Sequence, residues 1–361
     1  MPLSKIQGID GQVTPNLGRR NLITNGAMKI AQRSTSVTGI GAANGYFTVD
    51  RFNVKRGNLS GRLTMSQDDD TPEGFTKSLK LDCTTADAGV EAGQYFMINY
   101  NIEGQDLQQI KKGTSNAEKV TVSFYAKGTA KTYVCEFDDS DNNRHNSIPF
   151  TVSSSWTRHT FVFNADTTGA FTKDNNLSGS INIWLSGGTS FSGGSYTANT
   201  WVSRQATDNT RAVGVGNFFD NTSNELFITG LQMEVGDTAT DFEHRSFDEE
   251  RDLCYRYYYK QSATGNSGPC HNWTTAQVHG YIRLPKPMRA NPTGGNSSGT
   301  GNITFYTDAA RSSNMSANTS WNISNNHFPF IQCSGIGSFT AGFGGWYALA
   351  SSVYLELDAE L

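Results

Sequence analysis

The chain has 361 residues, of which 36% are hydrophobic and 17% are charged, and its formal net charge is −4. This length suits about two domains, at roughly 150 residues for each. The net charge and the lack of a Lys/Arg block exclude the positive surface that a nucleic-acid backbone requires, and no run approaches the ~20 apolar residues of a membrane helix. We therefore expect no nucleic-acid partner and no membrane insertion.

Residues 1–20 are polar, contain Gly8, Gly11 and Pro15, and show neither helical nor strand periodicity, which is typical of a mobile arm. The opening residues MPLSKIQGIDGQ lack the apolar core of a signal peptide. Five widely spaced cysteines form no CxxC pair, so we expect buried thiols in a protein made in a reducing cytoplasm.

Residues 21–245 alternate strand-like runs with turn-rich loops. No long helical pattern separates these runs, which predicts an antiparallel sandwich whose two sheets bury their facing sides. Gly230 interrupts one run and predicts a β-bulge there. The runs are Val120 to Ala126, Thr132 to Phe137, His159 to Asn164, Ile181 to Leu185, Val213 to Phe219 and Leu226 to Glu234.

Residues 246–260 predict a short helix that runs into a strand. Ser246 and Glu249 have the spacing of a capping box, which satisfies free backbone donors at a helix start. Tyr255, Tyr257 and Tyr259 then recur at period two, which favours a half-buried strand. The helix is therefore short, and we interpret it as a hinge between two β modules.

Residues 261–361 predict a smaller distal β domain. Val278, Gly280 and Ile282 alternate with polar and aromatic residues, and further strands are expected at Asn302–Thr307, His327–Gln332, Phe339–Trp346 and Ser351–Asp358. The connections are long and rich in Gly, Ser and Asn, and such loops indicate either function or disorder. We expect them at Ser262–Thr275, Thr293–Gly301 and Asp308–Asn326.

No catalytic motif stands out. Gly295 to Gly299 match the GxSxG pattern of serine hydrolases, but Pro292 and Gly301 flank the match where a strand and a helix are required. The six histidines show no metal-ligand spacing. We expect no catalytic residues.

Asp139, Asp141 and Asn143 have the spacing of the first ligands in a calcium loop. Arg144 replaces the glycine that such a loop needs, and Phe150 replaces its closing glutamate. A hairpin turn between two strands therefore explains these residues better.

Several tryptophans are candidates for ligand binding. Trp273 and Trp321 lie in expected loops beside polar residues such as His271 and Asn272, and large rings next to adaptable amides are typical of recognition loops. Trp201 offers a ring that can stack on the apolar face of a sugar. Two alternatives stay open, a subunit interface for Trp273 and Trp321 and a structural role for Trp201.

Segments along nearly the whole chain resemble bacteriophage tail fibre proteins. GLQMEVGDTATDFEHRSFDEERDLCYRYY is similar to the segment that closes a carbohydrate-binding-module-like jelly roll in those fibres. NLITNGAMKIAQR and GYFTVDRF resemble the opening of such a domain, and KVTVSFYAKG and SSSWTRHTFVFNADTTG resemble its inner strands. LPKPMRANPT and YLELDAEL resemble the distal part of the same fibres.

The resemblance implies a domain order and a set of partners. Residues 1–20 would attach to other virion tail proteins, 21–245 would form the jelly-roll β-sandwich, 246–260 the helical hinge and 261–361 the distal β-sandwich with receptor-facing loops. It also implies a homotrimer located in the virion tail. No cofactor is expected, although jelly rolls of this kind often hold a structural calcium ion, and that question stays open.

The resemblance further implies non-catalytic adhesion to a glycan on a bacterial surface. One alternative is a structural virion component, such as a collar, nozzle or fibre adaptor, that never contacts the receptor. Another is a glycan-degrading tailspike enzyme, which would need two carboxylates about 5 to 9.5 Å apart. The sequence identifies neither the receptor nor the host.

Overall fold

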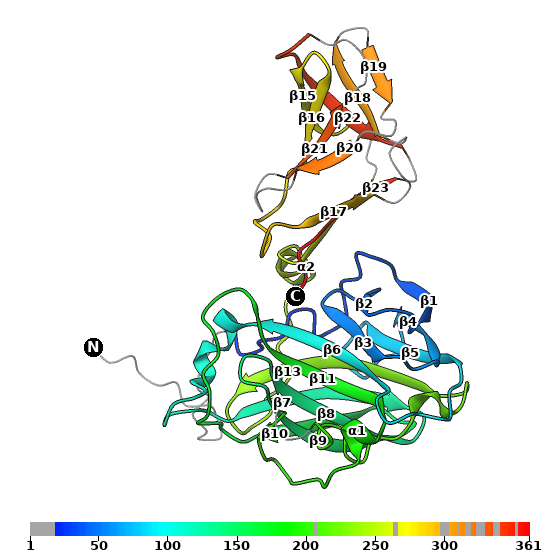
Figure 1. The fold of residues 1–361 in the computed structure, drawn as a ribbon, viewed down its shortest axis with the longest axis vertical. Coiled ribbons are helices and arrows are strands. Elements are labelled where there is room, and N and C mark those ends of the chain that lie inside the picture. The colour runs from blue at the N-terminus through cyan, green and yellow to red at the C-terminus, as the bar shows by residue number, and fades with distance from the viewer. Residues whose placement is uncertain are drawn as a thin grey trace. The chain divides into compact units, whose positions relative to one another are not determined.

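The computed structural model describes residues 19–204, 208–262, 266–296, 303–308, 311–314, 319–322, 329–334, 340–350 and 353–361. The chain divides into two compact units, unit 1 (Met1–Ser246) and unit 2 (Phe247–Leu361). Both consist mainly of β-strands, so the predicted all-β class is confirmed (Figure 1). Most of the expected arm, residues 1–18, lies outside the described residues. Among the described residues, no helix has the length and apolar character needed to cross a bilayer.

Two antiparallel sheets form unit 1. In the first, sheet A, the strand order is β1 (Ser36–Ile40), β4 (Arg62–Asp68), β5 (Ser78–Thr85), β13 (Glu225–Val235), β7 (Val120–Gly128) and β10 (Thr157–Phe163). In the second, sheet B, it is β12 (Val202–Ser203), β9 (Arg144–Val152), β8 (Lys131–Asp139), β11 (Leu177–Gly187), β6 (Tyr95–Glu103), β3 (Phe52–Gly57) and β2 (Gly45–Tyr46). Short helical turns occur at η1 (Gly104–Ile110), α1 (Thr189–Ser192) and η2 (Phe218–Asp220).

The alternation of side chains along each strand explains the sandwich of unit 1. On β8, Tyr133, Cys135 and Phe137 enter the core between the sheets, while Val134 and Glu136 face the other way. Aliphatic and phenylalanine side chains from both sheets fill this single core. Burying such large apolar surfaces is the main stabilising contribution to a sandwich of this kind.

The outer face of sheet B is also covered. Trp184 is fully buried there with Met97 and Val134, beneath Phe191 and Ala212 of the segment that follows β11. Residues 188–217 therefore act as a flap over this face. The buried position expected for Trp184 is found, but outside the main core.

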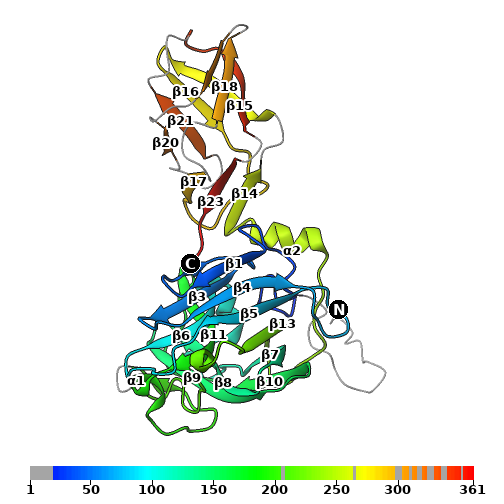
Figure 2. The same ribbon diagram turned by 90° about the vertical axis from the view of Figure 1, so that its right-hand side faces the viewer.

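Unit 2 contains one helix, α2 (Phe247–Cys254), and two sheets. Sheet C has the order β14 (Tyr258–Ser262), β23 (Tyr354–Asp358) and β17 (Thr293–Asn296). Sheet D has the order β19 (Arg311–Asn314), β18 (Ile303–Asp308), β22 (Gly344–Leu349), β15 (Asn266–Thr274), β16 (Gln277–Tyr281), β21 (Phe330–Ser334) and β20 (Thr319–Asn322). Figure 2 shows both sheets from the side.

One hydrophobic cluster joins the two sheets of unit 2. Val278, Ile331 and Tyr347 enter it from sheet D, and Leu355 and Leu357 enter it from β23 of sheet C. Because both sheets bury one face against a common core, unit 2 is a smaller β-sandwich.

Strands also occupy two segments where the sequence predicts loops. Residues 266–274 form β15, which pairs with both β16 and β22, and Thr319–Asn322 form β20. Trp273 and Trp321 therefore belong to strands. On β15 the inward positions include Asn272 as well as Cys270, so no hydrophobic alternation marks this strand in the sequence.

Candidate functional site: an aromatic surface on unit 2

Aromatic rings gather on the outer face of sheet D, opposite the core of unit 2. His271 lies across from His279, Tyr281 across from Phe330, and Tyr306 across from Trp346. Their strand neighbours point into the core, so alternation places all these rings on one side. This aromatic surface consists of His271, Trp273, His279, Tyr281, Tyr306, Phe330 and Trp346.

One group of rings stacks across β15, β16 and β21. His279 lies between Trp273 and Phe330, with centroid distances of 5.3 and 4.6 Å and interplanar angles of 12° and 30°. His271 stacks on Tyr281 at 5.5 Å and 7°. Cross-strand aromatic pairs of this kind stabilise a sheet, so the sheet holds the rings in fixed orientations.

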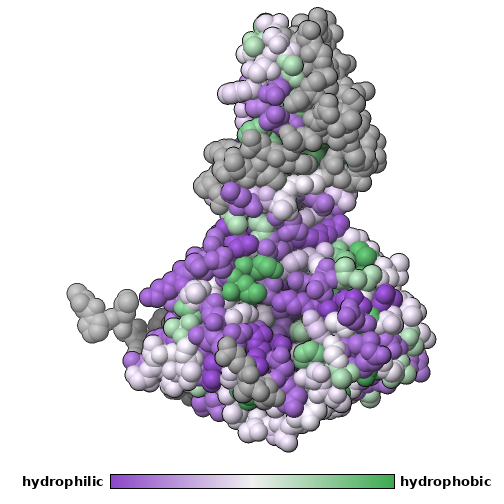
Figure 3. All heavy atoms as spheres, viewed as in Figure 1, coloured by the Kyte–Doolittle hydropathy of each residue, from purple (hydrophilic) through white to green (hydrophobic). Residues whose placement is uncertain are grey.

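A second group lies on the neighbouring strands β18 and β22. Tyr306 and Trp346 stack at a centroid distance of 5.5 Å and an interplanar angle of 18°. The exposed fractions of Trp273, Trp346 and Tyr306 are 61%, 44% and 36%. By contrast, the face of unit 1 seen in Figure 3 is mostly hydrophilic, with hydrophobic residues in small separate patches. Exposed ring groups that are this contiguous generally mark a binding surface.

The aromatic surface carries little charge. The described parts of β15, β16, β21 and β22 contain no Asp, Glu, Lys or Arg. Burial lowers the pKa of His279, and the neighbouring His271 adds to this effect, so the His279 imidazole is neutral at neutral pH. The Nε2 atom of His279 is buried and has no hydrogen-bond partner among the described residues.

The residues proposed from the sequence are partly brought together. His271 and Trp273 lie on the aromatic surface, 5.9 Å apart between ring centroids. Asn272 is fully buried on the opposite face, where its side-chain amide donates to the carbonyl of Thr340 at 3.0 Å. For Trp321, the backbone pairs with Ile331, but its side chain lies outside the described residues.

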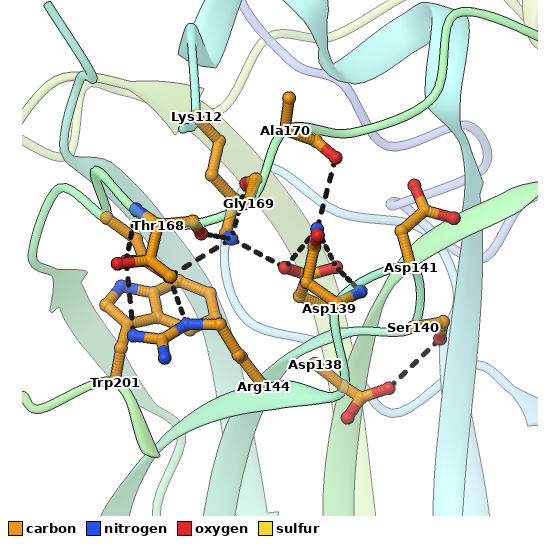
Figure 4. Close-up of polar contacts among 12 residues, drawn as sticks. Lys112, Asp138, Asp139, Ser140, Asp141, Arg144, Thr168, Gly169, Ala170 and Trp201 are labelled. Carbon is orange, nitrogen blue, oxygen red and sulfur yellow. Dashed lines mark hydrogen bonds and ion pairs between the residues drawn. The ribbon is translucent and has the colours of Figure 1, made fainter. Parts of the chain in front are cut away.

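Trp201 lies in unit 1 and is held by its own neighbours. Its indole Nε1 donates to the carbonyl of Asn164 at 2.7 Å, and its ring contacts Phe137 edge-on at a centroid distance of 5.2 Å. The ammonium of Lys112 lies 5.2 Å from the ring centroid. These contacts give the Trp201 ring a packing role next to a buried cation (Figure 4).

Lys112 places its ammonium inside a cage of oxygen atoms. The Nζ atom lies 2.5 Å from Asp139 Oδ2 and 3.0 Å from Asp166 Oδ2. It also donates to the carbonyls of Thr168 at 2.7 Å and Gly169 at 2.9 Å. The ammonium thus ties together the end of η1, the β8–β9 turn and the β10–β11 connection (Figure 4).

The cage also accounts for the aspartates that show calcium-loop spacing in the sequence. Asp139 ends β8 and Arg144 begins β9, so these residues form the predicted hairpin turn. The carboxylate of Asp139 pairs with Lys112, and Arg144 pairs with Asp166 through its Nε at 2.7 Å. Within the described residues, no group of three or more His, Cys, Asp or Glu has a geometry that could hold a metal.

A pair of carboxylates does occur on the outer face of sheet B. Glu136 accepts hydrogen bonds from Arg211 at 2.7 and 2.9 Å, from Asn182 at 2.7 Å and from Trp184 at 2.9 Å. Asp138 pairs with Arg204 at 3.1 Å, and burial raises the pKa of Asp138 to about 6.

Both carboxylates are covered. The exposed fractions are 0% for Glu136 and 4% for Asp138. Their arginine partners both belong to the flap of residues 188–217, so the pair fastens the flap to the sheet. A glycosidase needs carboxyl groups that can reach the bond to be cleaved, and the oxygens of Glu136 are already occupied by four donors.

Five aromatic residues of the surface were missed from the sequence: His279, Tyr281, Tyr306, Phe330 and Trp346. The alternation of Val278 and Gly280 already indicates that His279 and Tyr281 face the other side of their strand. What the sequence does not contain is the pairing register, which brings Phe330, Tyr306 and Trp346 onto the same face.

No protein-family model matches the sequence, and no curated protein matches it either. Among solved structures, a family 11 carbohydrate-binding module of a Clostridium thermocellum cellulase superposes with a TM-score of 0.29 and 11% identity, covering 58% of this chain and 99% of the module. A xylan-binding domain, CBM22-1 from Paenibacillus barcinonensis, gives a TM-score of 0.27 and 10% identity, covering 61% of this chain and 96% of the domain. At these scores the likeness carries no conclusion about ligands or binding residues.

Proposed function

We propose that this chain is a receptor-binding or tail fibre protein of a bacteriophage that adheres to a glycan on the bacterial surface without a chemical step. The observation that carries the binding function is the exposed, charge-poor aromatic surface of unit 2. The phage assignment is supported by the ordered series of segments, from NLITNGAMKIAQR to YLELDAEL, that resembles tail fibre proteins.

The chemistry of the aromatic surface suits sugars. Pyranose rings present apolar C–H faces that pack on aromatic rings, while their hydroxyl groups stay in water or bond to nearby polar atoms. Trp273 and Trp346 have only two side-chain torsions each, and their stacking partners already restrict these torsions. Binding therefore costs little side-chain entropy.

Weak sites of this kind gain strength from repetition. In the proposed homotrimer, three copies of the surface act together, so the second and third contacts form at high effective concentration. Residues 1–20 attach the trimer to other tail proteins in the virion, and unit 1 serves as the jelly-roll body. These assignments follow from the resemblance and are proposals.

Adsorption to cells tests the function. The purified chain is labelled and mixed with a panel of bacterial strains, alongside the variants Trp273→Ala and Phe343→Ala. Phe343 is a matched control because 52% of its side chain is exposed and it belongs to neither ring stack. We expect adsorption to fall for Trp273→Ala and to persist for Phe343→Ala.

The alternatives give different results in the same system. A structural virion component would not adsorb to any strain and would not compete with phage. A glycan-degrading enzyme would release new reducing ends continuously from extracted envelope polysaccharide, and sustained release would overturn the proposal of binding without chemistry.

A further inference from the structure

The outer face of sheet D has a bare strip between its two groups of rings. Gly344 in β22 and Gly342 just before it are both exposed. A Cβ atom added to Gly344 would meet nothing closer than the carbonyl oxygen of Cys270 at 3.9 Å, and one added to Gly342 would meet nothing within 4 Å. The backbone of this strip is therefore open to solvent on the ring-bearing face.

The rings on β15 turn one face towards this strip. β15 lies between β16 and β22 in the sheet. His271 and Trp273 stack on the β16 side, against Tyr281 and His279. Since one face of each ring is covered from that side, the second face is directed towards β22 and the glycine strip.

Trp346 closes the strip from the other side. It stacks on Tyr306 of β18, and β18 lies on the side of β22 away from β15. The second face of the Trp346 ring is therefore directed towards β15. His271 lies across from Gly344, and Trp346 across from Pro269, so His271 and Trp346 are diagonal neighbours.

The spacing of diagonal neighbours fits a single inserted ring. Such pairs are about 7–8 Å apart in an antiparallel sheet. A flat ring in contact with both walls needs about 3.5–4.0 Å on each side. The glycine strip and the rings beside it thus make a slot of about one ring's thickness.

We infer that this slot, defined by Gly342, Gly344, His271, Trp273 and Trp346, binds one uncharged pyranose ring of a glycan chain between facing aromatic rings. The inference rests on the proposed function and names its subsite and ligand class. An uncharged sugar fits because the described residues of β15, β16 and β22 offer no cation for a carboxylate, sulfate or phosphate group. Arg283 is the first charged residue after β16, and it lies beyond Tyr281 on the side away from the slot.

Filling the slot tests this inference. Gly344→Val adds a branched side chain above the strip, in a strand where valine is favourable. The matched control is Gly89→Val in unit 1, because a Cβ at Gly89 also meets nothing within 4 Å. Trp346→Ala is the second variant, and it removes one wall instead of filling the gap.

The wild-type chain and the three variants are applied to an array of neutral and acidic bacterial surface glycans. Thermal unfolding and light scattering confirm that each variant is folded and keeps the wild-type oligomeric state. We expect binding to neutral glycans that falls at least about tenfold in Gly344→Val and Trp346→Ala, equivalent to about 1.4 kcal/mol, and persists in Gly89→Val.

The failures are distinguishable. If the wild type binds no glycan on the array, the proposed function fails and the slot fails with it. If the wild type binds but Gly344→Val binds equally well, or if only acidic glycans are bound, the function stands and the slot is wrong. If Gly344→Val instead dissociates the oligomer, the strip is an interface between copies of the chain and the inference is overturned.

Discussion

Replacing Lys112 with methionine removes the ammonium from its cage and keeps a side chain of similar length. Asp139 and Asp166 are 0% and 5% exposed as side chains, and Lys112 itself is 1% exposed. Asp166 keeps its pairing with Arg144. Asp139 loses its only cation and retains hydrogen bonds from Asn142.

The expected cost is large because the charges are buried. Removing one partner of a buried ion pair destabilises a protein by about 3–5 kcal/mol. The carbonyls of Thr168 and Gly169 also lose a donor, which works in the same direction. For a domain the size of unit 1, this predicts a fall of about 10 °C in the unfolding temperature.

Scanning calorimetry of the whole chain measures this change in the transition of unit 1. The neighbouring variant Lys111→Met is the matched control, because the Lys111–Glu118 pair is 52% and 43% exposed and such pairs contribute about 0–1 kcal/mol. The double variant Lys112→Met/Asp139→Asn should recover part of the loss, since it removes the uncompensated carboxylate. Equal unfolding temperatures for Lys112→Met and Lys111→Met would refute the stabilising role of the cage.

Three further changes have defined outcomes. The pKa of Asp138 is raised to about 6 from 3.8 in the folded state, so its stabilising contribution is complete below the unfolded value and is lost as the pH rises through 6. Urea unfolding of Asp138→Asn should therefore lose about 1 kcal/mol less than the wild type between pH 5 and pH 8, and identical pH profiles would contradict this. Asn272→Ala should destabilise unit 2 by about 1–3 kcal/mol, because it leaves the buried carbonyl of Thr340 without its donor, and an unchanged urea midpoint would rule this out. Gly345→Ala should disrupt unit 2, since its Cβ would lie 1.8 Å from the carbonyl oxygen of Tyr306, and a variant with wild-type stability would show that the two strands can separate at no cost.

The fold class follows from local patterns in the sequence. The run predicted at Val120–Ala126 becomes β7, and the run at Leu226–Glu234 becomes β13 with an interruption at Gly230. Gly230 has a φ of 68°, and the pairing of β13 with β7 shifts between Thr229 and Gln232. The predicted bulge is therefore confirmed, because glycine is the residue that tolerates such a backbone conformation.

The candidate site was only partly accessible from the sequence. His271 and Trp273 attract notice as a large ring beside a polar neighbour, but β15 contains Gly268, Pro269 and Asn272 and lacks the hydrophobic alternation of an ordinary strand. Its place in the sheet depends on pairing with β16 and β22. Because register is a long-range property, the sequence alone leaves the two ring stacks unassembled.

Trp201 shows the same limit in unit 1. Its ring looks available from sequence neighbours alone. The residues that hold it come from distant segments, with Lys112 after η1, Phe137 in β8 and Asn164 after β10. Only the folded sandwich brings them together.

The most direct test of the central claim is the indole ¹⁵N–¹H spectrum of the full chain during titration with a glycan that it binds. The chain has six tryptophans, each with one indole signal. We predict that the signals of Trp273 and Trp346 shift with glycan concentration, while those of the enclosed Trp184 and Trp201 stay in place. Binding that moves the unit 1 signals and leaves Trp273 and Trp346 unchanged would contradict the assignment of the aromatic surface as the glycan site.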